Sequence, residues 1–402
     1  MILTANPAPS SEGIYLDYQA STPVDPEVLE AMLPWWRHGG TGNPHSHEHA
    51  FGWRAAKAID DARSQIAALI GAESEDLIFT SGATESNNVA ILGTMRAEEP
   101  ARRTFLLTAI DHASVLGPAT TLSREGFHCV ALPVDSNGHL QRDSFLSYLT
   151  PDVRLVSVGA ANNEIGTLQD LPWIAARCHE VGALLHTDAA QALTALPVSV
   201  SEWGVDLASF SAHKAYGPQG VGALYVAPGL IRRLRAHYFG GGQQSGVRPG
   251  TLPTALCAGF GAACEILSRQ GHVERESVAR LRDRLVSSLL KAIPGAALNG
   301  PREVRHPGNA NLRIPGIVAS DLIQRLQPIV ALSSGSACHS GSDQPSHVLR
   351  AIGLTDETAR ASVRVALGRF TTDSGIATAV ALIVSAVQMS QSVVQPRCDY
   401  GG

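Results

Sequence analysis

The feature that most constrains the fold is an alternation of short apolar segments with longer helical ones over the first half of the chain. The apolar segments are rich in β-branched or aromatic residues and occupy residues 77–80, 104–108, 155–159, 183–187 and 207–210. Such segments are typical of parallel strands that are buried on both faces. Helical stretches are expected between them, at residues 55–70, 85–97, 114–125 and 173–181. This order predicts an α/β fold with a large, doubly wound, mainly parallel sheet.

The length of the chain predicts more than one domain. A chain of 402 residues exceeds what one hydrophobic core usually serves. The Gly- and Pro-rich stretch 240–253 is expected to be a loop, and two helices are expected after it, at 254–270 and 274–292. Cys257 and Cys264 share one face of the first of these helices and are expected in the core. We predict a large domain at 15–262 and a smaller α/β domain formed by 1–14 and 263–402.

Charge and cysteine content exclude several classes of protein. The net charge of −5 gives no basic surface for a phosphate backbone, so no direct nucleic-acid partner is expected. The N-terminus has no signal-peptide pattern, and the apolar segment 376–389 is too short to span a bilayer, so no membrane partner is expected. The six cysteines have neither disulfide-framework nor zinc-finger spacing. These features predict a cytoplasmic protein with free thiols.

Polar residues follow the predicted strands at the edge where a doubly wound sheet binds its ligands. The turn Gly82-Ala83-Thr84 leads from a strand into a helix, and its amides together with the Thr84 hydroxyl suit one phosphate. An ordinary capped strand–helix turn needs the same residue types, so this motif alone is ambiguous. Asp188 follows another strand and could keep a pyridine nitrogen protonated, or could merely cap a helix.

Lys214 follows a third buried strand, in a turn of small residues. Desolvation makes a lysine amine nucleophilic, as bonding to an aldehyde cofactor requires, although a surface lysine is the alternative. His112 offers a ring that could stack on a cofactor and move protons, and Asn163 adds an amide at a fourth strand end. Together these residues fit pyridoxal 5′-phosphate. Neither a G-x-G-x-x-G turn for a nicotinamide cofactor nor the GK[ST] of a P-loop is present.

Two further residues point to the substrate. Cys338 lies near the centre of SSGSACHSGS, where a reactive thiol could reach a substrate, although an incidental cysteine in a serine-rich loop is the alternative. Arg364 lies within an apolar stretch and could bind a carboxylate through two hydrogen bonds, or could form a structural ion pair.

The chain resembles the cysteine desulfurases of the class V aminotransferase group. The resemblance runs from about Tyr15 to Thr372, and its motifs include YLDYQASTPVDPEVLEAM, IFTSGATESNN, NNEIGTLQDL, DAAQ, SFSAHKAYGPQGVGALYV, RPGTLPT, LSSGSACHSGSDQPSHVLRAIG and VRVALGRFTT. It implies fold type I of the pyridoxal-phosphate enzymes and a homodimer. It also implies the branch with a long catalytic-cysteine loop, here about 333–345. Such enzymes convert L-cysteine to L-alanine and pass a cysteine-bound persulfide to a sulfur-acceptor protein, for iron–sulfur cluster assembly or thiolation of RNA or other acceptors.

The resemblance also implies roles for individual residues. The catalytic residues would be Cys338, Lys214 and His112, with Lys214 bonded to the cofactor and His112 stacked on its ring. Asp188 would pair with the ring nitrogen and Gln191 with the ring hydroxyl oxygen. Asn163 and Arg364 would bind the substrate carboxylate. The phosphate would be held by the turn at Ala83 and by the hydroxyl and imidazole groups of Thr84, Ser211, His213 and, from the partner subunit, Thr251.

Some features depart from the pattern or stay open. The resemblance implies a longer tail that engages a cluster scaffold in the housekeeping members of the family, whereas this chain ends in QMSQSVVQPRCDYGG. Scaffold docking and the acceptor therefore stay open, and Cys398 is either a relay thiol or idle. His45, His47 and His49 could suggest a metal, but the resemblance places them in a loop near the site, and no metal is expected. The alternative functions are a selenocysteine lyase, another enzyme of the class V fold, or a non-catalytic sulfur carrier.

Overall fold

A large, mainly parallel sheet dominates the computed structural model, which describes residues 13–98, 101–334 and 344–394. Within these residues the sheet has seven strands in the order β2-β8-β7-β6-β5-β3-β4, and β8 runs antiparallel to both of its neighbours. The five predicted strands are present within two residues of their expected bounds. The strands are β2 (Leu77–Thr80), β3 (Thr104–Thr108), β4 (His128–Leu132), β5 (Val153–Ser157), β6 (Leu184–Asp188), β7 (Leu207–Ser211) and β8 (Gly222–Val226).

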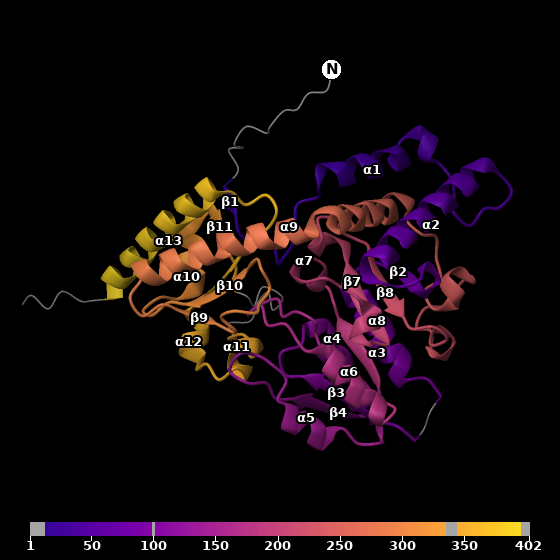
Figure 1. Cartoon of the computed structure of the whole chain (residues 1–402), viewed down its shortest axis with the longest axis horizontal. Helices are drawn as coiled ribbons and strands as arrows, with labels where there is room; N and C mark the ends of the chain where they lie inside the picture. The colour runs from indigo at the N-terminus through magenta and orange to yellow at the C-terminus, as the bar shows by residue number, and fades with distance from the viewer. Residues whose placement is uncertain (1–12, 99–100, 335–343, 395–402) are drawn as a thin grey trace, which may run out of the picture.

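Helices cover both faces of this sheet (Figure 1). On one face, α3 (Ala83–Met95) and α4 (Ala113–Arg124) bury a cluster that includes Phe105 and Leu224. On the other face, α2 (Ala50–Ile70) and α6 (Leu171–Glu180) bury a larger cluster around Phe210. Because both faces are covered, the strands carry apolar residues at most positions, which is the pattern seen in the sequence. The predicted doubly wound α/β fold is confirmed.

A second, smaller group of strands and helices follows the large sheet in the chain. Three antiparallel strands, in the order β12-β10-β9, pack with α10 and α13 around a second apolar cluster that includes Leu16. The segment at the start of the described chain reaches this body through the parallel pairing of β1 with β11. The bounds are β1 (Ile14–Tyr15), β9 (Ala297–Asn299), β10 (Asn309–Arg313), β11 (Val330–Ala331), β12 (Ser362–Ala366), α10 (Ala319–Leu326) and α13 (Asp373–Val394).

Short elements connect these parts. They are α1 (Pro26–Trp36), α5 (Arg142–Tyr148), α7 (Ala192–Ala195), α8 (Val200–Trp203), α11 (His347–Ala351) and α12 (Asp356–Arg360), with 3₁₀ turns η1 (His38–Gly40), η2 (Ser74–Asp76), η3 (Ala212–Lys214), η4 (Ile231–Arg233) and η5 (Gln243–Gly246).

One long helix, α9 (Thr254–Ala292), joins the two bodies (Figure 1). The prediction of two helices here was wrong, because a single Gly271 does not end a helix that is packed along its length. Cys257 and Cys264 are fully buried against the large sheet, as expected, whereas Leu285 and Leu289 lie in the second cluster. The domain boundary at 262/263 falls inside this continuous helix and stays a prediction.

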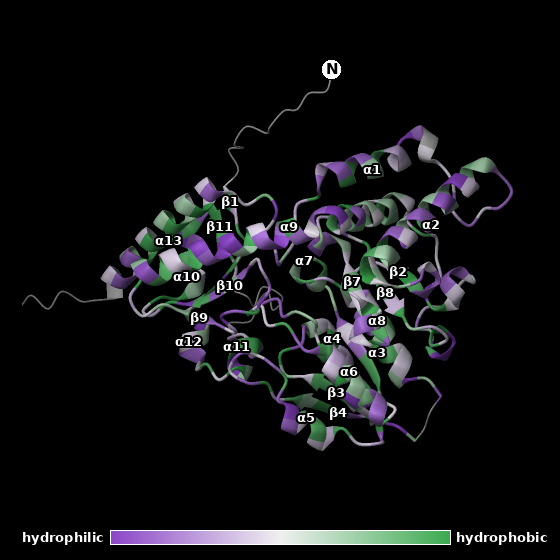
Figure 2. Ribbon diagram, in the orientation of Figure 1, coloured by the Kyte–Doolittle hydropathy of each residue, from purple (hydrophilic) through white to green (hydrophobic). Residues whose placement is uncertain are grey.

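The helix α13 is longer than the apolar segment seen in the sequence. Residues Asp373–Ser392 are long and apolar enough to cross a membrane by length and composition alone, so the expectation that this segment is too short was wrong. In Figure 2, α13 is largely green or pale, whereas much of the neighbouring stretch of α9 is purple. Five of its side chains are buried in the second cluster: Ile376, Ala379, Ile383, Ala386 and Val387. One face of α13 therefore packs on this cluster, and 28% of the membrane-length window is buried.

A partly buried arginine, three residues after β12, joins the start of α1 to the middle of α9. Arg369 forms ion pairs with Asp25 and Glu274, the latter at 2.8 Å, and its guanidinium lies 4.0 Å from the centre of the Tyr216 ring. We expect Arg369→Ala to lower the free energy of unfolding by about 3 kcal/mol, because two carboxylates lose their counter-ion in a poorly solvated place. Denaturant unfolding measures this. The matched control is Arg350→Ala, which removes the exposed pair with Asp356 and should leave stability nearly unchanged.

Candidate active site

Most of the predicted site residues line one cavity. It has a volume of about 510 Å³ and lies at the carboxyl ends of the central strands, where a doubly wound sheet binds its ligands. Ten predicted residues line it: Ala83, Thr84, His112, Asn163, Asp188, Gln191, Ser211, His213, Lys214 and Arg364. Of the remaining two, Thr251 lines a neighbouring pocket and Cys338 lies outside the described residues.

The turn from β2 into α3 forms one end of the cavity. The cap residue Gly82 has no side chain to accept hydrogen bonds from the first helical turn, so the amides there face the cavity uncapped. Its φ of 150° favours glycine, and a Cβ at this position would point at the Ser211 hydroxyl, 3.7 Å away. A helix N-terminus beside two hydroxyl-bearing residues, Thr84 and Ser211, is suited to one phosphate group.

His213 adds a neutral imidazole to this end of the cavity. Burial, with a smaller effect of the charge on Lys214, lowers the pKa of His213 to about 4. Its Nδ1 lies 3.2 Å from the Ser21 hydroxyl. At neutral pH this side chain therefore offers a hydrogen bond, not a positive charge, to an anion.

Lys214 lies in the turn directly after β7. Its Nζ donates hydrogen bonds to the carbonyl oxygens of Gln19 and Ala20, at 2.6 and 2.7 Å. Both acceptors come from a segment almost two hundred residues away in the chain, and this long-range contact holds the amine at the wall of the cavity. The alternative of a solvated surface lysine does not describe this half-buried position.

Asp188 ends β6 and lies across the same strand edge. Its Oδ2 accepts a hydrogen bond from the Asn87 side chain at 2.8 Å, and its Oδ1 accepts one from the Ala190 amide at 3.0 Å. Two residues earlier, burial lowers the pKa of His186 to about 4, so this imidazole lies neutral beneath the site between two serine hydroxyls. Gln191, in the next turn, donates to the Gln19 carbonyl at 3.0 Å.

His112 is the cap residue of α4. Its Nδ1 lies 2.8 Å from the Ser114 hydroxyl and accepts a hydrogen bond from the Ser114 amide at 3.1 Å. The preceding Asp111 is buried and accepts from the backbone amides of Thr108 and Gly159. Burial nevertheless raises the pKa of Asp111 to about 7.

Arg364 enters the cavity from β12. Its Nη2 forms an ion pair with Asp17 at 2.7 Å, and its Nη1 donates to the backbone carbonyl of Asn163 at 3.1 Å. The side chain is 2% exposed, and its Nε has no hydrogen-bond partner in the described part of the chain. The structural ion pair that was one of the two predictions for Arg364 is therefore present, with Asp17 as the partner. The same guanidinium group also lines the cavity.

A buried glutamate lies next to this arginine. Glu164 accepts a hydrogen bond from the Ser346 hydroxyl at 2.5 Å, and Ser346 is the cap residue of α11, eight residues after Cys338 in the chain. Burial raises the pKa of Glu164 to about 7, against the opposing effects of Ser346, Arg364 and His112. The folded protein therefore favours the neutral carboxyl group.

This raised pKa predicts a pH-dependent loss of stability. A folded-state pKa of about 7 lies above the reference value of 4.5. The stability that the neutral Glu164 contributes is therefore complete below about pH 4.5 and is lost as the pH rises through 7, by about 3 kcal/mol. In Glu164→Gln, which keeps the neutral shape, this part of the pH dependence should vanish in denaturant titrations. The exposed control Glu303→Gln should follow the wild type, and a Glu164→Gln profile identical to the wild type would contradict the prediction.

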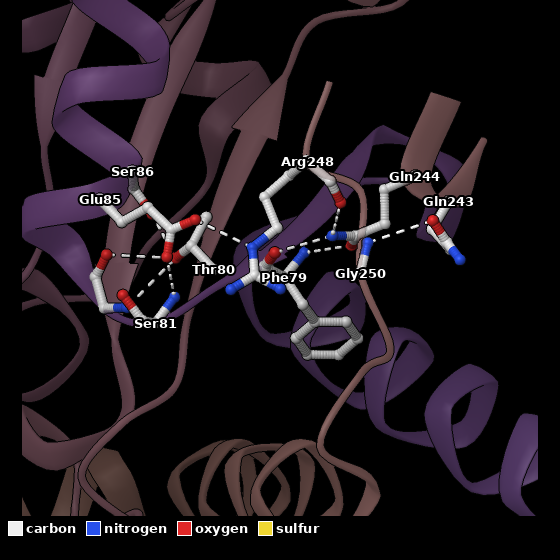
Figure 3. Close-up of polar contacts among 10 residues, drawn as sticks. Phe79, Thr80, Ser81, Glu85, Ser86, Gln243, Gln244, Arg248 and Gly250 are labelled. Carbon is white, nitrogen blue, oxygen red and sulfur yellow. Dashed lines mark hydrogen bonds and ion pairs between the residues drawn. The ribbon is translucent and has the colours of Figure 1, made fainter. Parts of the chain in front are cut away.

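The loop 243–250, which precedes Thr251 in the chain, is joined to β2 and α3 (Figure 3). The Gln244 side chain pairs with both backbone groups of Phe79, at 2.6 and 2.8 Å, and Arg248 forms an ion pair with Glu85 at 2.9 Å. Thr251 lines a second pocket together with Ser81 and Glu85, which also line the main cavity. Within this chain Thr251 does not reach the main cavity, so its assigned role depends on a second subunit.

The structure also bears on the predictions for the cysteines and for the histidines at 45, 47 and 49. Four cysteines in the described part of the chain, at 129, 178, 257 and 264, are free. Cys398, like Cys338, lies outside the described residues. His49 Nδ1 accepts from the Gly52 amide and caps α2, and the described residues contain no group of three His, Cys, Asp or Glu side chains placed to hold a metal ion.

Sequence reasoning assigned no role to several residues that shape the site. Asp17, Gln19, Asn87 and Glu164 lie in motifs that carry the resemblance, so a signal was present for them. Asn87, Ser114 and Glu164 act through contacts with residues 27 to 182 positions away. No local pattern in the sequence indicates such contacts.

Comparisons with known proteins agree with this geometry. Residues 14–378 match the class V aminotransferase family. The cysteine desulfurase IscS of Rickettsia typhi is 44% identical over 374 residues, which cover 93% of this chain and 91% of that protein. A NifS-like protein of known structure superposes with a TM-score of 0.87 at 32% identity, over 94% of this chain and 100% of the other. SspA in complex with cysteine gives a TM-score of 0.78 at 33% identity, over 89% and 99%. The cavity and these similarities together mean that the chain belongs to the class V aminotransferase family and, within it, to the cysteine desulfurases.

Proposed function

We propose that this cysteine desulfurase uses pyridoxal 5′-phosphate held in the cavity at the carboxyl ends of β6 and β7. The observation that carries the proposal is the position of Lys214 in one cavity with the carboxylate of Asp188 and the uncapped N-terminus of α3. An amine, a carboxylate and an anion site match the aldehyde, ring nitrogen and phosphate of this cofactor. When bound, the cofactor supplies an electron-withdrawing ring conjugated to the substrate Cα.

The residues of this chain divide the work of holding that group. The first turn of α3, with Thr84, Ser211 and neutral His213, binds the phosphate. Asp188 keeps the ring nitrogen protonated, and Asn87 and the Ala190 amide fix the orientation of its carboxylate. The Gln191 amide binds the ring hydroxyl oxygen.

The substrate is oriented at the other end of the cavity. Arg364 binds the carboxylate of L-cysteine, with Asn163 beside it, and Asp17 holds the guanidinium in place from behind. Glu164, which follows Asn163 in the chain, accepts a hydrogen bond from Ser346, the cap residue of α11. The Lys214 amine lies at the cavity wall, where it takes the proton from Cα and returns one to the product.

The transfer of sulfur from L-cysteine to Cys338 needs no external oxidant. The Cys338 thiolate attacks the sulfur of the substrate, a sulfur–sulfur bond forms, and the Cβ–sulfur bond of the substrate breaks. The carbon is reduced and gains a proton to become the methyl group of L-alanine, while the transferred sulfur remains as a persulfide on Cys338. A sulfur-acceptor protein then removes it.

A second copy of the chain completes the site in this proposal. Thr251 lines a pocket with Tyr238 and Phe239, and these two side chains are 50% and 91% exposed. Large exposed aromatic groups beside the cavity are typical of a surface that a partner covers. In a homodimer, Thr251 of one subunit then serves the phosphate of the other.

Incubation with L-cysteine tests the proposed reaction against its alternatives. We expect alanine to form without added 2-oxo acid, and the Cys338 peptide to gain the mass of one sulfur atom. A requirement for a 2-oxo acid would indicate an aminotransferase. Release of selenide from selenocysteine by Cys338→Ala, together with inactivity of the wild type on L-cysteine, would indicate a selenocysteine lyase.

A further inference from the structure

A chain of buried hydrogen bonds connects the carboxylate of Asp188 with the imidazole of His112. Asn87 Nδ2 lies 2.8 Å from Asp188 Oδ2 and 2.8 Å from the Ser114 hydroxyl. The Ser114 hydroxyl in turn lies 2.8 Å from His112 Nδ1. Asn87 is fully buried and Ser114 is 8% exposed, so water does not compete for these contacts.

The direction of each hydrogen bond follows from the chemistry of the groups. A carboxylate only accepts, so the group of Asn87 that faces Asp188 must be the amide NH₂. The same nitrogen donates to Ser114, and the buried Oδ1 atom of Asn87 has no hydrogen-bond partner among the residues that the structure describes. The Ser114 oxygen accepts from Asn87 through one lone pair, which leaves its hydroxyl proton available for His112 Nδ1, 2.8 Å away.

A second donor converges on the same ring nitrogen. The backbone amide of Ser114 donates to His112 Nδ1 at 3.1 Å. An amide proton and a hydroxyl proton both directed at Nδ1 require a lone pair there. In the neutral ring the proton then lies on the other nitrogen, Nε2.

We propose that Asn87 and Ser114 are positioning residues that lock His112 in the neutral tautomer with its proton on Nε2. His112, which lines the cavity, then acts on cofactor or substrate as a hydrogen-bond donor of fixed direction. Asp188 orients Asn87, so one hydrogen-bonded chain orients both groups that flank the proposed ring. The tautomer is a property of the protein alone, whereas its use in catalysis rests on the proposed function.

Nitrogen NMR of the full-length, cofactor-free protein with labelled histidine tests the tautomer. The signals of His112 are identified by their loss in His112→Gln. At mildly alkaline pH we expect a protonated Nε2 and an unprotonated Nδ1 in the wild type. In Ser114→Ala one of the two donors is lost, and both tautomers should become populated. Ser114→Thr keeps the hydroxyl and should restore the wild-type signals.

A matched control separates this effect from a general loss of packing. Ser86→Ala removes another fully buried hydroxyl, at the residue before Asn87. The Ser86 hydroxyl pairs with that of Thr80 and does not belong to the hydrogen-bonded chain to His112. It should leave the tautomer unchanged. Desulfuration by the holoenzyme should fall about tenfold in Ser114→Ala, as expected for one lost hydrogen bond.

Two results would overturn the proposal: a proton on Nδ1 in the wild type, or an unchanged Nε2 tautomer in both Ser114→Ala and Asn87→Ala. Because the NMR signals need neither cofactor nor turnover, a protein that is inactive on cysteine but shows the Nε2 tautomer would contradict only the proposed function.

Discussion

Replacing Lys214 with alanine is expected to lower alanine formation from L-cysteine by at least about a thousandfold. In the proposed function this amine bonds the cofactor and moves the Cα proton, and the Gln19 and Ala20 carbonyls that orient it cannot replace it. The measurement is alanine release by the purified variant with added pyridoxal 5′-phosphate. In the wild type, borohydride reduction should leave the cofactor attached to the Lys214 peptide.

The control for this variant is Lys57→Ala, which removes an exposed lysine paired with Asp61 at 2.7 Å on the surface of α2. It should keep wild-type activity and the same reduced adduct on Lys214. If Lys214→Ala retained a substantial part of the wild-type rate, or if the adduct formed on another lysine, the assignment of the catalytic amine would be wrong.

Cys338→Ser is expected to abolish sulfur transfer while leaving the preceding proton chemistry intact. Lys214, Asp188 and Arg364 are unchanged in this variant, so L-cysteine should still exchange its Cα proton with deuterium from solvent. The serine hydroxyl cannot accept the sulfur, and alanine should fall below detection. Mass spectrometry for alanine and deuterium in the same sample measures both steps.

The control here is Cys129→Ser. Cys129 is a free thiol in β4, and burial raises its pKa, so it is a poor nucleophile. This variant should form alanine at the wild-type rate. Loss of both exchange and alanine in Cys338→Ser would instead place Cys338 in the formation of the site.

The sequence predicted the large sheet and most of the cavity for a physical reason. A strand buried on both faces is a short apolar run, and the residue after it faces the ligand edge, so Asp188 and Lys214 could be found from their neighbours alone. The continuity of α9 was missed, because Gly271 is a plausible break in a sequence but is tolerated where the helix packs on both sides.

Contacts between distant segments were the other part that the sequence did not reveal. Three contacts depend on which segments the fold brings together. They are the hydrogen bond from Lys214 to Gln19, the ion pair of Arg364 with Asp17, and the hydrogen bond from Asn87 to Ser114. Periodicity and spacing describe near neighbours in the chain and carry no information on such pairs. Thr251 is a related case, because its proposed partner group belongs to a second subunit.

The central claim is that sulfur leaves L-cysteine through a persulfide on Cys338. The most direct measurement is the yield of alanine and sulfide from L-cysteine with a thiol reductant, for the wild type beside Cys338→Ala. We expect equimolar alanine and sulfide from the wild type and neither from the variant. A wild-type protein that binds pyridoxal 5′-phosphate but releases no alanine, or a variant as active as the wild type, would contradict the claim.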